Sequence, residues 1–121
     1  MTRIALVEDT PDNRLLVQAM IADRYEITEY EDGPTALEGM AGDVPDLVLL
    51  DISLPGMDGV EVLQRMRAEE RYAKVPVIAL TAHAMAGDRE KYLAAGFDGY
   101  VSKPIVDEAL LVDAIEAALA A

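Results

Sequence analysis

Acidic side chains follow two of the most apolar runs in this sequence. Glu8 and Asp9 come directly after the run from Ile4 to Val7, and Asp51 comes directly after the run from Leu47 to Leu50. Unbroken apolar runs of this length are typical of strands that are buried on both faces of a parallel sheet. If the two strands are neighbours, the three carboxylates meet at the carboxyl edge of the sheet, where ligands bind in open α/β folds.

The three carboxylates predict a bound cation. Each close pair of negative charges costs roughly 4 kcal/mol at an effective dielectric constant of about 20. Without a cation, at least one of the groups should hold its proton more tightly. Mg²⁺ removes this conflict, because it binds carboxylate oxygens and keeps waters that a phosphate oxygen can replace. A carboxylate beside Mg²⁺ can also attack a phosphoryl group, which gives an aspartyl phosphate.

Two hydrogen-bond donors stand at the ends of two further predicted strands. Thr81 closes the run from Val75 to Leu80, and Lys103 follows the short run from Gly99 to Ser102. A hydroxyl and an ammonium at the same edge are suited to hold the oxygens of a transferred phosphoryl group. The side chains together predict phosphoryl chemistry centred on Asp51.

Helical periodicity and turn residues fill the segments between the strands. Pro11 and Pro34 are expected at the first turns of two helices, Asp58 with Glu61 has the pattern of a capping box, and Asp107 is expected to cap the last helix. The expected strands cover residues 4–7, 26–30, 47–50, 75–80 and 99–102. The expected helices cover about 11–24, 34–42, 60–70, 86–95 and 107 to the end of the sequence.

Strands and helices therefore alternate five times, which predicts an α/β fold. Short connections and right-handed crossovers give a doubly wound five-stranded parallel sheet with helices on both faces. The two most apolar strands, 4–7 and 47–50, belong in the middle, and the more polar strand 26–30 belongs at an edge. The strand order 2-1-3-4-5 meets these conditions and sets Glu8 and Asp9 beside Asp51.

Composition restricts the classes of function. With 121 residues, of which 52% are apolar, the chain is expected to form one domain over residues 1–121, with no output domain. A net charge of -13 argues against nucleic acid as a partner. No apolar run is long enough to cross a bilayer, and the apolar start is too short for the signal peptide that a secreted protein would need. There is also no cysteine, so a reducing cytoplasm is expected.

This set of residues resembles the receiver domain of bacterial two-component response regulators, of the stand-alone, single-domain type. The resemblance covers nearly the whole chain. It rests on four segments: the acidic pair 8–9, the stretch Leu-Leu-Asp-Ile-Ser-Leu-Pro-Gly-Met-Asp-Gly at 49–59, Leu-Thr-Ala at 80–82, and Gly-Tyr-Val-Ser-Lys-Pro at 99–104. The stretch 81–96 is also similar to stand-alone receivers and to those fused to hybrid kinases.

The resemblance implies a role for each residue of the acidic cluster. Asp51 accepts phosphate from a phosphohistidine of a sensor histidine kinase or a histidine phosphotransfer protein. Asp9 and Asp51 ligate Mg²⁺, or Mn²⁺ as an alternative ion, together with the backbone of Ser53, and Glu8 acts through water. On this view the chain is a phosphoacceptor signalling domain in a phosphorelay and not an enzyme that turns over a substrate.

A switch is expected beside the acceptor. Phosphate on Asp51 would draw in the Thr81 hydroxyl, and the ring of Tyr100 would turn into the space behind it. A downstream protein would then read the surface of the fourth helix, fifth strand and fifth helix. A cis peptide bond between Lys103 and Pro104 would turn the ammonium back toward Asp51.

Other classes of protein fit the sequence less well. A phosphatase of the haloacid-dehalogenase type needs a second aspartate two residues after the nucleophile, and Ser53 stands there. An FMN carrier with this strand order needs a phosphate-binding loop after the first strand, whereas Glu8 and Asp9 would repel phosphate. A plain acidic scaffold leaves the convergence of five functional groups unexplained.

Overall fold

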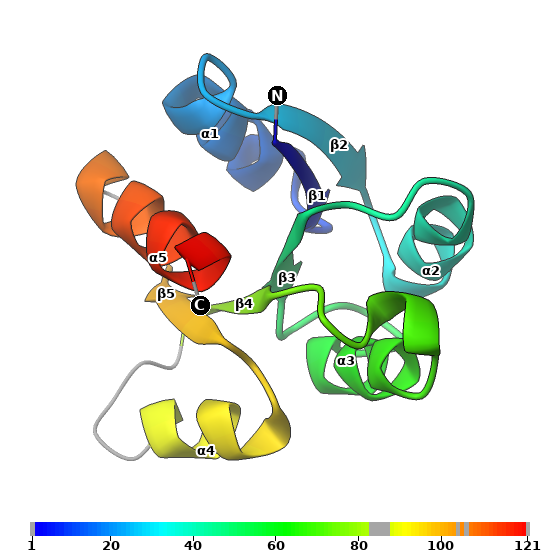
Figure 1. Ribbon diagram of the computed structural model, residues 1–121. Coiled ribbons are helices and arrows are strands. Elements are labelled where there is room, and N and C mark those ends of the chain that lie inside the picture. Colours follow the sequence, from blue (N-terminus) through cyan, green and yellow to red (C-terminus); the bar gives the residue numbers. More distant parts are fainter. Residues whose placement is uncertain (1, 83–87, 104, 106, 121) are drawn as a thin grey trace.

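The computed structural model describes residues 2–82, 88–103, 105 and 107–120, and these form a parallel sheet between two layers of helices (Figure 1). The sheet has five strands in the order β2-β1-β3-β4-β5, which confirms the predicted order. The strands are β1 (Arg3–Val7), β2 (Glu26–Tyr30), β3 (Leu47–Asp51), β4 (Val77–Thr81) and β5 (Gly99–Ser102).

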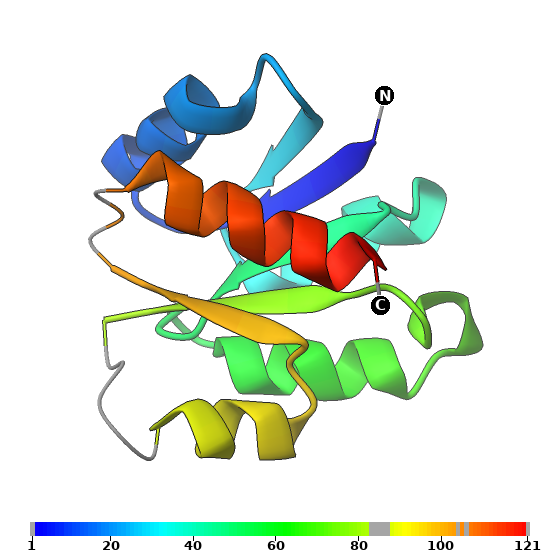
Figure 2. The ribbon, with the colours of Figure 1, turned by 60° about the vertical axis from the view of Figure 1, so that its left-hand side comes forward.

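The helices divide between the two faces of the sheet. They are α1 (Pro11–Ile21), α2 (Gly33–Gly42), α3 (Gly59–Arg67), α4 (Asp88–Ala95) and α5 (Glu108–Ala120), with a short 3₁₀ helix at Glu70–Tyr72. In the two ribbon views, α1 and α5 cover one face, and α2, α3 and α4 cover the other (Figures 1 and 2).

Side chains alternate between the two faces of the sheet along each strand and so form two separate hydrophobic cores. On β3, Leu47 and Leu49 pack toward α1 and α5, whereas Val48 and Leu50 pack toward the opposite helices. All five residues of β3 are buried. Fully burying a leucine or valine side chain is worth about 1.5–3 kcal/mol, so the central strand needs an apolar residue at each position that faces a helix layer. A charged residue at its end, Asp51, therefore needs its own explanation.

Some elements end earlier or begin later than their periodicity predicts. Helix α1 ends at Ile21 and not near residue 24, because the amides of Arg24 and Tyr25 both bond to the Ile21 carbonyl and turn the chain. Strand β4 begins at Val77 and not at Val75, since Pro76 has no amide hydrogen to give to a ladder. The predicted third helix ends three residues early, at Arg67, before the 3₁₀ turn that buries Tyr72.

Aspartate caps begin several helices. The side chains of Asp32 and Asp58 accept hydrogen bonds from the amides three residues later, and the Asp107 carboxylate accepts from the amide of Ala109. Only half of the predicted capping box forms, because the Glu61 carboxylate pairs with Arg65 on the next turn of α3. Gly96, with φ of 111°, ends α4 in the left-handed region, as expected of a C-terminal glycine.

Candidate functional site

The register between β1 and β3 brings the acidic residues together. Val7 lies opposite Leu50, so Glu8 and Asp51 follow as the next residues on neighbouring strands. One carboxylate oxygen from each of Glu8, Asp9 and Asp51 lies within 4.8 Å of the others. Glu8 is fully buried and Asp51 is 2% exposed, while Asp9 is exposed to solvent. The three acids predicted to meet at this edge do so.

Lys103 is the counterion of the two buried acids. Its ammonium Nζ lies 3.1 Å from Oδ2 of Asp51 and 3.2 Å from Oε2 of Glu8, and its side chain is 18% exposed. The ammonium reaches them because β5 ends beside β4, where the amide of Lys103 donates to the Thr81 carbonyl at 2.7 Å. Sequence reasoning assigned Lys103 to the phosphoryl oxygens and did not anticipate its pairing with Glu8.

Helix α1 also holds Glu8. The side-chain amide of Asn13 donates to Oε1 of Glu8 at 3.0 Å, and the guanidinium of Arg14 donates to the Glu8 carbonyl at 2.7 Å. Sequence analysis treated Asn13 only as part of the first helix. The sequence feature that could have revealed Asn13 is its position five residues after Glu8, because this spacing places the first turn of α1 next to the end of β1. Glu8 is thus fixed by hydrogen bonds from both the helix and the lysine.

The charged groups of Glu8, Asp51 and Lys103 lie close together in the buried part of the site, and this affects the pKa of Asp51 and of Lys103. Burial raises the pKa of the Asp51 carboxyl above its ordinary value, and the negative charge of Glu8 adds to this. Hydrogen bonds from the Ser53 backbone and from Lys103 offset only part of the increase. For Lys103, burial opposes the charge, but Asp51 and Glu8 outweigh it and raise the pKa of the ammonium. A second positive charge would therefore be favourable here.

The loop after β3 fixes the orientation of Asp51. The backbone amide of Ser53 donates to Oδ1 of Asp51 at 3.0 Å, which leaves Oδ2 for Lys103. The loop then folds back so tightly that the amide of Gly59 bonds to the Ile52 carbonyl. A Cβ atom at Gly59 would lie 2.3 Å from the carbonyl oxygen of Asp51, so only glycine allows this close approach.

The donor set fits a hard divalent cation. Three carboxylates converge from two strand ends, one of them is exposed to an incoming ion, and the described residues supply one compensating ammonium for the two buried acids. Oxygen ligands on a rigid strand end, with an open side toward solvent, suit Mg²⁺, which prefers few protein ligands and several waters.

The hydroxyl of Thr81 faces helix α4. Alternation along β4 puts Thr81 on the same face as Val77 and Ala79, and its Oγ1 lies 2.9 Å from the hydroxyl oxygen of Tyr92. Both side chains are buried. Tyr100 on β5 is half-buried, with its ring centroid 6.5 Å from that of Tyr92. Sequence analysis selected Thr81 and Tyr100 and missed Tyr92, which lies close to both.

Some predictions concern residues outside the described part of the chain. The cis bond between Lys103 and Pro104 is one of them, since residue 104 is not described, and so is the expected start of the fourth helix near residue 86. These remain predictions.

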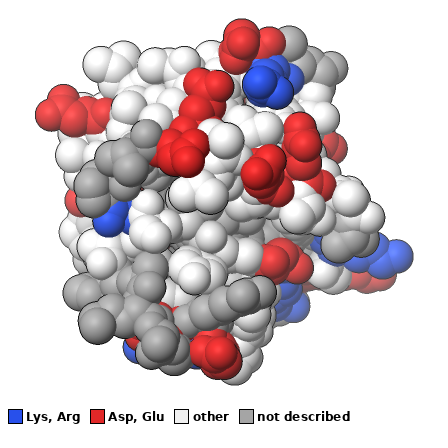
Figure 3. Space-filling model, turned by 90° about the vertical axis from the view of Figure 1, so that its left-hand side faces the viewer, with Lys and Arg blue, Asp and Glu red and all other residues white. Residues whose placement is uncertain are grey.

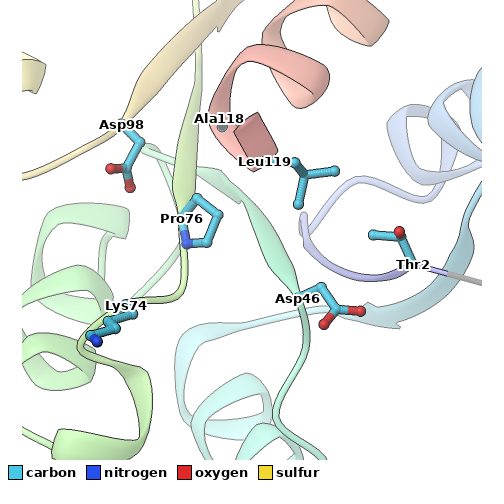
Figure 4. Close-up of a pocket in the computed structure, with 7 residues that line it drawn as sticks. All are labelled: Thr2, Asp46, Lys74, Pro76, Asp98, Ala118 and Leu119. Atoms are coloured by element: carbon cyan, nitrogen blue, oxygen red, sulfur yellow. The ribbon is translucent and has the colours of Figure 1, made fainter. Parts of the chain in front are cut away.

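A second hollow, of about 970 Å³, lies at the opposite end of the sheet (Figure 4). It is lined by residues that precede the strands or end α5. Its acids are already engaged: Asp46 accepts from the amide of Arg3 at 2.8 Å, and Asp98 accepts from the amide of Val77 at 2.8 Å and from Arg67. These bonds fix the starts of β1 and β4, so the hollow is a feature of the scaffold.

Acidic side chains outnumber basic ones in this chain, by 23 to 10. On the face seen in Figure 3, acidic side chains lie at several separate places and basic side chains are fewer. Among the described residues, no helix combines the length and the apolar character needed to cross a bilayer.

Comparison with known proteins gives the family. The fold superposes with a TM-score of 0.88 on the receiver domain of the sensor histidine kinase PA1611 of Pseudomonas aeruginosa PAO1, at 36% identity over 99% of this chain and 98% of that one. That crystal structure has a magnesium ion coordinated in its active-site cleft. A family model described as the response regulator receiver domain matches residues 4–116. The chain belongs to this family, as the resemblance implied.

Similar sequences occur inside longer proteins. The chain is 41% identical over 106 residues to the response regulator PleD of Caulobacter vibrioides and 39% identical over 112 residues to the sensor protein GacS of Pseudomonas syringae. The matches cover 87% and 89% of this chain, but only 23% of PleD and 12% of GacS. The likeness therefore concerns the receiver domain and not the whole of those proteins.

Proposed function

We propose that this receiver accepts a phosphoryl group from a phosphohistidine onto Asp51, in a reaction that requires Mg²⁺, and that it signals by contact with other proteins. The observation that carries the proposal is the position of Asp51. It is the one member of the acidic cluster at the end of the central strand, and its two oxygens are oriented by Ser53 and Lys103.

The proposed step exchanges one bond to phosphorus for another. An oxygen of the Asp51 carboxylate forms a bond to phosphorus, and the bond from phosphorus to the histidine nitrogen breaks. The nitrogen keeps the electron pair of that bond, and the product on this chain is an acyl phosphate. Asp51 must be ionised to attack, which the hydrogen bonds from the Ser53 backbone and Lys103 favour.

Asp9, Asp51 and the backbone of Ser53 are the proposed ligands of the ion, with Glu8 acting through water. Held there, Mg²⁺ supplies positive charge against the oxygens of the incoming phosphoryl group. The magnesium ion in the cleft of the PA1611 receiver supports this assignment. The protein itself contributes a fixed cluster: Glu8 is held by Asn13 and by Lys103, so the cleft does not have to be assembled when the ion arrives.

Lys103 and Thr81 are the proposed donors to the phosphoryl oxygens. The Lys103 ammonium is already 3.1 Å from the acceptor carboxylate, so a small movement brings it to an oxygen on phosphorus. Thr81 has to turn away from α4 to reach the same group. Its movement, with that of Tyr100, is the proposed link to the surface formed by α4, β5 and α5.

The proposed partners are proteins of the cytoplasm. A histidine kinase or phosphotransfer protein would dock over α1, where Leu15 is 70% exposed, and a downstream target would bind the face of α4, β5 and α5. Both a phosphate shuttle and an allosteric regulator are compatible with this arrangement, since each uses the same acceptor.

Phosphorylation of two matched variants tests the acceptor. Asp51→Asn keeps the shape of the side chain and removes the nucleophile, so labelling by a small phosphodonor such as acetyl phosphate should be lost. Asp58→Asn is the control, because Asp58 is an exposed carboxylate on the same loop and asparagine caps helices equally well. It should label at the wild-type rate. Labelling of Asp51→Asn at that rate would exclude Asp51 as the acceptor.

Removal of divalent ions tests the metal requirement. An excess of chelator should abolish labelling of the wild-type chain, and added Mg²⁺ should restore it. Undiminished labelling in chelator would contradict the proposed role of the three carboxylates.

A further inference from the structure

Tyr92 of α4 lies where it can control the proposed switch at Thr81. The two hydroxyl oxygens are 2.9 Å apart, Thr81 is 1% exposed and Tyr92 is 4% exposed. The hydrogen bond therefore joins the end of β4 to the middle of α4 inside the core. It ties Thr81 toward the helix, on the face of the sheet opposite to α1 and α5.

The Tyr92 ring is fixed by its aromatic neighbours. It meets the ring of Phe97 edge to face, with centroids 6.2 Å apart and an angle of 89° between the planes. The ring of Tyr100 lies on another side at 6.5 Å, inclined by 41°. Since a tyrosine side chain has only two rotatable bonds before the ring, its hydroxyl cannot follow Thr81 far without moving the ring and its neighbours.

Breaking the hydrogen bond between Thr81 and Tyr92 therefore affects both side chains. Either hydroxyl can be the donor in this bond. In both cases the Thr81 oxygen has to move away from Tyr92 when its proton turns toward a phosphoryl oxygen, so the bond is lost. Losing a hydrogen bond inside the core is unfavourable, so the packing of α4 around the Tyr92 oxygen has to adjust. The hydrogen bond therefore opposes the movement of Thr81, and its loss changes the packing of α4 and the surroundings of Tyr100.

We propose that Tyr92 is a positioning residue that holds Thr81 in its resting orientation, so that the Tyr92 hydroxyl competes with the phosphoryl group on Asp51 for Thr81. This inference rests on the proposed function, in which Thr81 moves toward the phosphorylated acceptor. It adds a residue that sets the balance between the resting and active states and that connects the acceptor to α4 directly, beside the route through Tyr100.

Affinity for beryllofluoride, a mimic of the phosphoryl group, measures this competition. With Mg²⁺ present, Tyr92→Phe should bind beryllofluoride about three- to tenfold more tightly than wild type, the fold-change that corresponds to losing one competing neutral hydrogen bond. In a Thr81→Ala background, Tyr92→Phe should leave the affinity unchanged, because the competition no longer exists.

Tyr72→Phe is the matched control. Tyr72 belongs to the same core cluster as Tyr92, and its buried hydroxyl has no hydrogen-bond partner among the described residues. Removing it should not alter the affinity for beryllofluoride. Equal effects of the two substitutions would reduce the role of Tyr92 to general packing and overturn the inference.

Two further outcomes would also overturn it. Weaker binding by Tyr92→Phe would mean that Tyr92 donates to Thr81 in the active state and assists it. Unchanged binding would mean that the two hydroxyls do not compete. If wild type itself fails to bind beryllofluoride, the proposed function is wrong and the inference falls with it.

A measurement on the wild-type chain avoids dependence on the folding of the variants. With tyrosines labelled by ¹³C at Cζ, beryllofluoride should shift the Tyr92 resonance as its hydroxyl loses Thr81, while the Tyr72 resonance stays in place. A Tyr92 resonance that does not move would contradict the proposal.

Discussion

Lys103 lies between two buried carboxylates whose charges would otherwise oppose each other. Its ammonium is within 3.2 Å of both Glu8 and Asp51, and the acids raise its pKa although burial opposes the charge. The lysine therefore has a structural role in addition to its proposed role in holding phosphoryl oxygens. Its positive charge offsets part of the repulsion between the two acids and so holds them close together before any cation binds.

Replacing Lys103 by methionine should expose this structural role. Lys103→Met keeps an unbranched side chain but leaves Glu8 and Asp51 without their ammonium, so the free energy of unfolding at neutral pH without Mg²⁺ should fall by about 3 kcal/mol. Urea unfolding measures it. Lys74→Met, at an exposed lysine, should stay within about 0.5 kcal/mol of wild type.

The pH dependence of this difference follows from the direction of the Lys103 pKa shift. A folded-state pKa above the unfolded one means that the stabilisation is complete below the unfolded value, about 10.4, and is lost as the pH rises through the folded value. The gap between wild type and Lys103→Met should therefore persist at neutral pH and close in strong alkali. A gap that closes near neutral pH would contradict the ion pairs.

Residue types at strand ends predicted the acidic cluster, but they did not predict its partners. Glu8 and Asp51 were detectable because they directly follow apolar runs, and Lys103 because it follows the short predicted strand at 99–102. Asn13 and Tyr92 sit inside helices, where an amide or an aromatic ring is ordinary. The contacts of Asn13 with Glu8 and of Tyr92 with Thr81 can be identified only when the packing of each helix against the strand ends is known.

At the scale of elements, the connection from β3 to α3 is the most tightly constrained part of the site. The first residue of α3, Gly59, approaches the backbone of Asp51 and Ile52 so closely that a methyl group has no space. The constraint is between two backbones, which cannot give way as a flexible side chain would. The loop that carries Ser53 therefore has its shape set by the start of the helix.

Gly59→Ala should destabilise the chain and disturb the proposed acceptor, Asp51. The added Cβ would lie 2.3 Å from the Asp51 carbonyl oxygen and 2.9 Å from Cα of Ile52, so the loop must shift, at a cost of about 1–3 kcal/mol or more in the free energy of unfolding. Phosphorylation by acetyl phosphate should slow in parallel.

Gly42→Ala is the control at the other end of the molecule. A Cβ at Gly42, the last residue of α2, meets nothing within 4 Å, so this variant should be as stable as wild type or more stable by up to about 1 kcal/mol. It should also accept phosphate normally. A Gly59→Ala variant that matches Gly42→Ala in both measurements would refute the close approach as a constraint on the site.

Periodicity located the elements well and their ends less well. Helix α1 was predicted three residues too long because residues up to Arg24 have no strong helix breaker, while the structure turns earlier to bury Tyr25 before β2. In the same way, the need to bury Tyr72 ends α3 in a 3₁₀ turn. Tertiary burial of a single aromatic residue overrode the local pattern in both cases.

At the scale of the whole molecule, the sheet separates two hydrophobic cores, and the acidic residues of the site lie at the ends of its strands β1 and β3. Successive residues of β1 and β3 enter opposite cores, with Leu6 and Leu49 on one side and Val7 and Leu50 on the other. The strand order that creates this arrangement was predicted from the apolar character of the strands together with short connections and right-handed crossovers, because a strand buried on both faces needs an unbroken apolar run. A cation held by the ends of β1 and β3 should therefore stabilise both cores together.

Unfolding in the presence and absence of Mg²⁺ tests this coupling. At an ion concentration of 100 times the dissociation constant, the free energy of unfolding should rise by about 2.7 kcal/mol, because the unfolded chain does not hold the three acids together. With fluorotyrosine incorporated, the resonances of Tyr25 in one core and Tyr72 in the other report each side separately in ¹⁹F spectra. The folded-state resonances of both tyrosines should disappear at one denaturant midpoint, and both midpoints should move equally when Mg²⁺ is added.

The control variant Asp9→Asn removes the exposed acid without touching either core. It should abolish the gain in stability from Mg²⁺ and leave the midpoint without Mg²⁺ nearly unchanged. A shift confined to one tyrosine would show that the cores unfold independently, and an undiminished gain in Asp9→Asn would place the ion elsewhere.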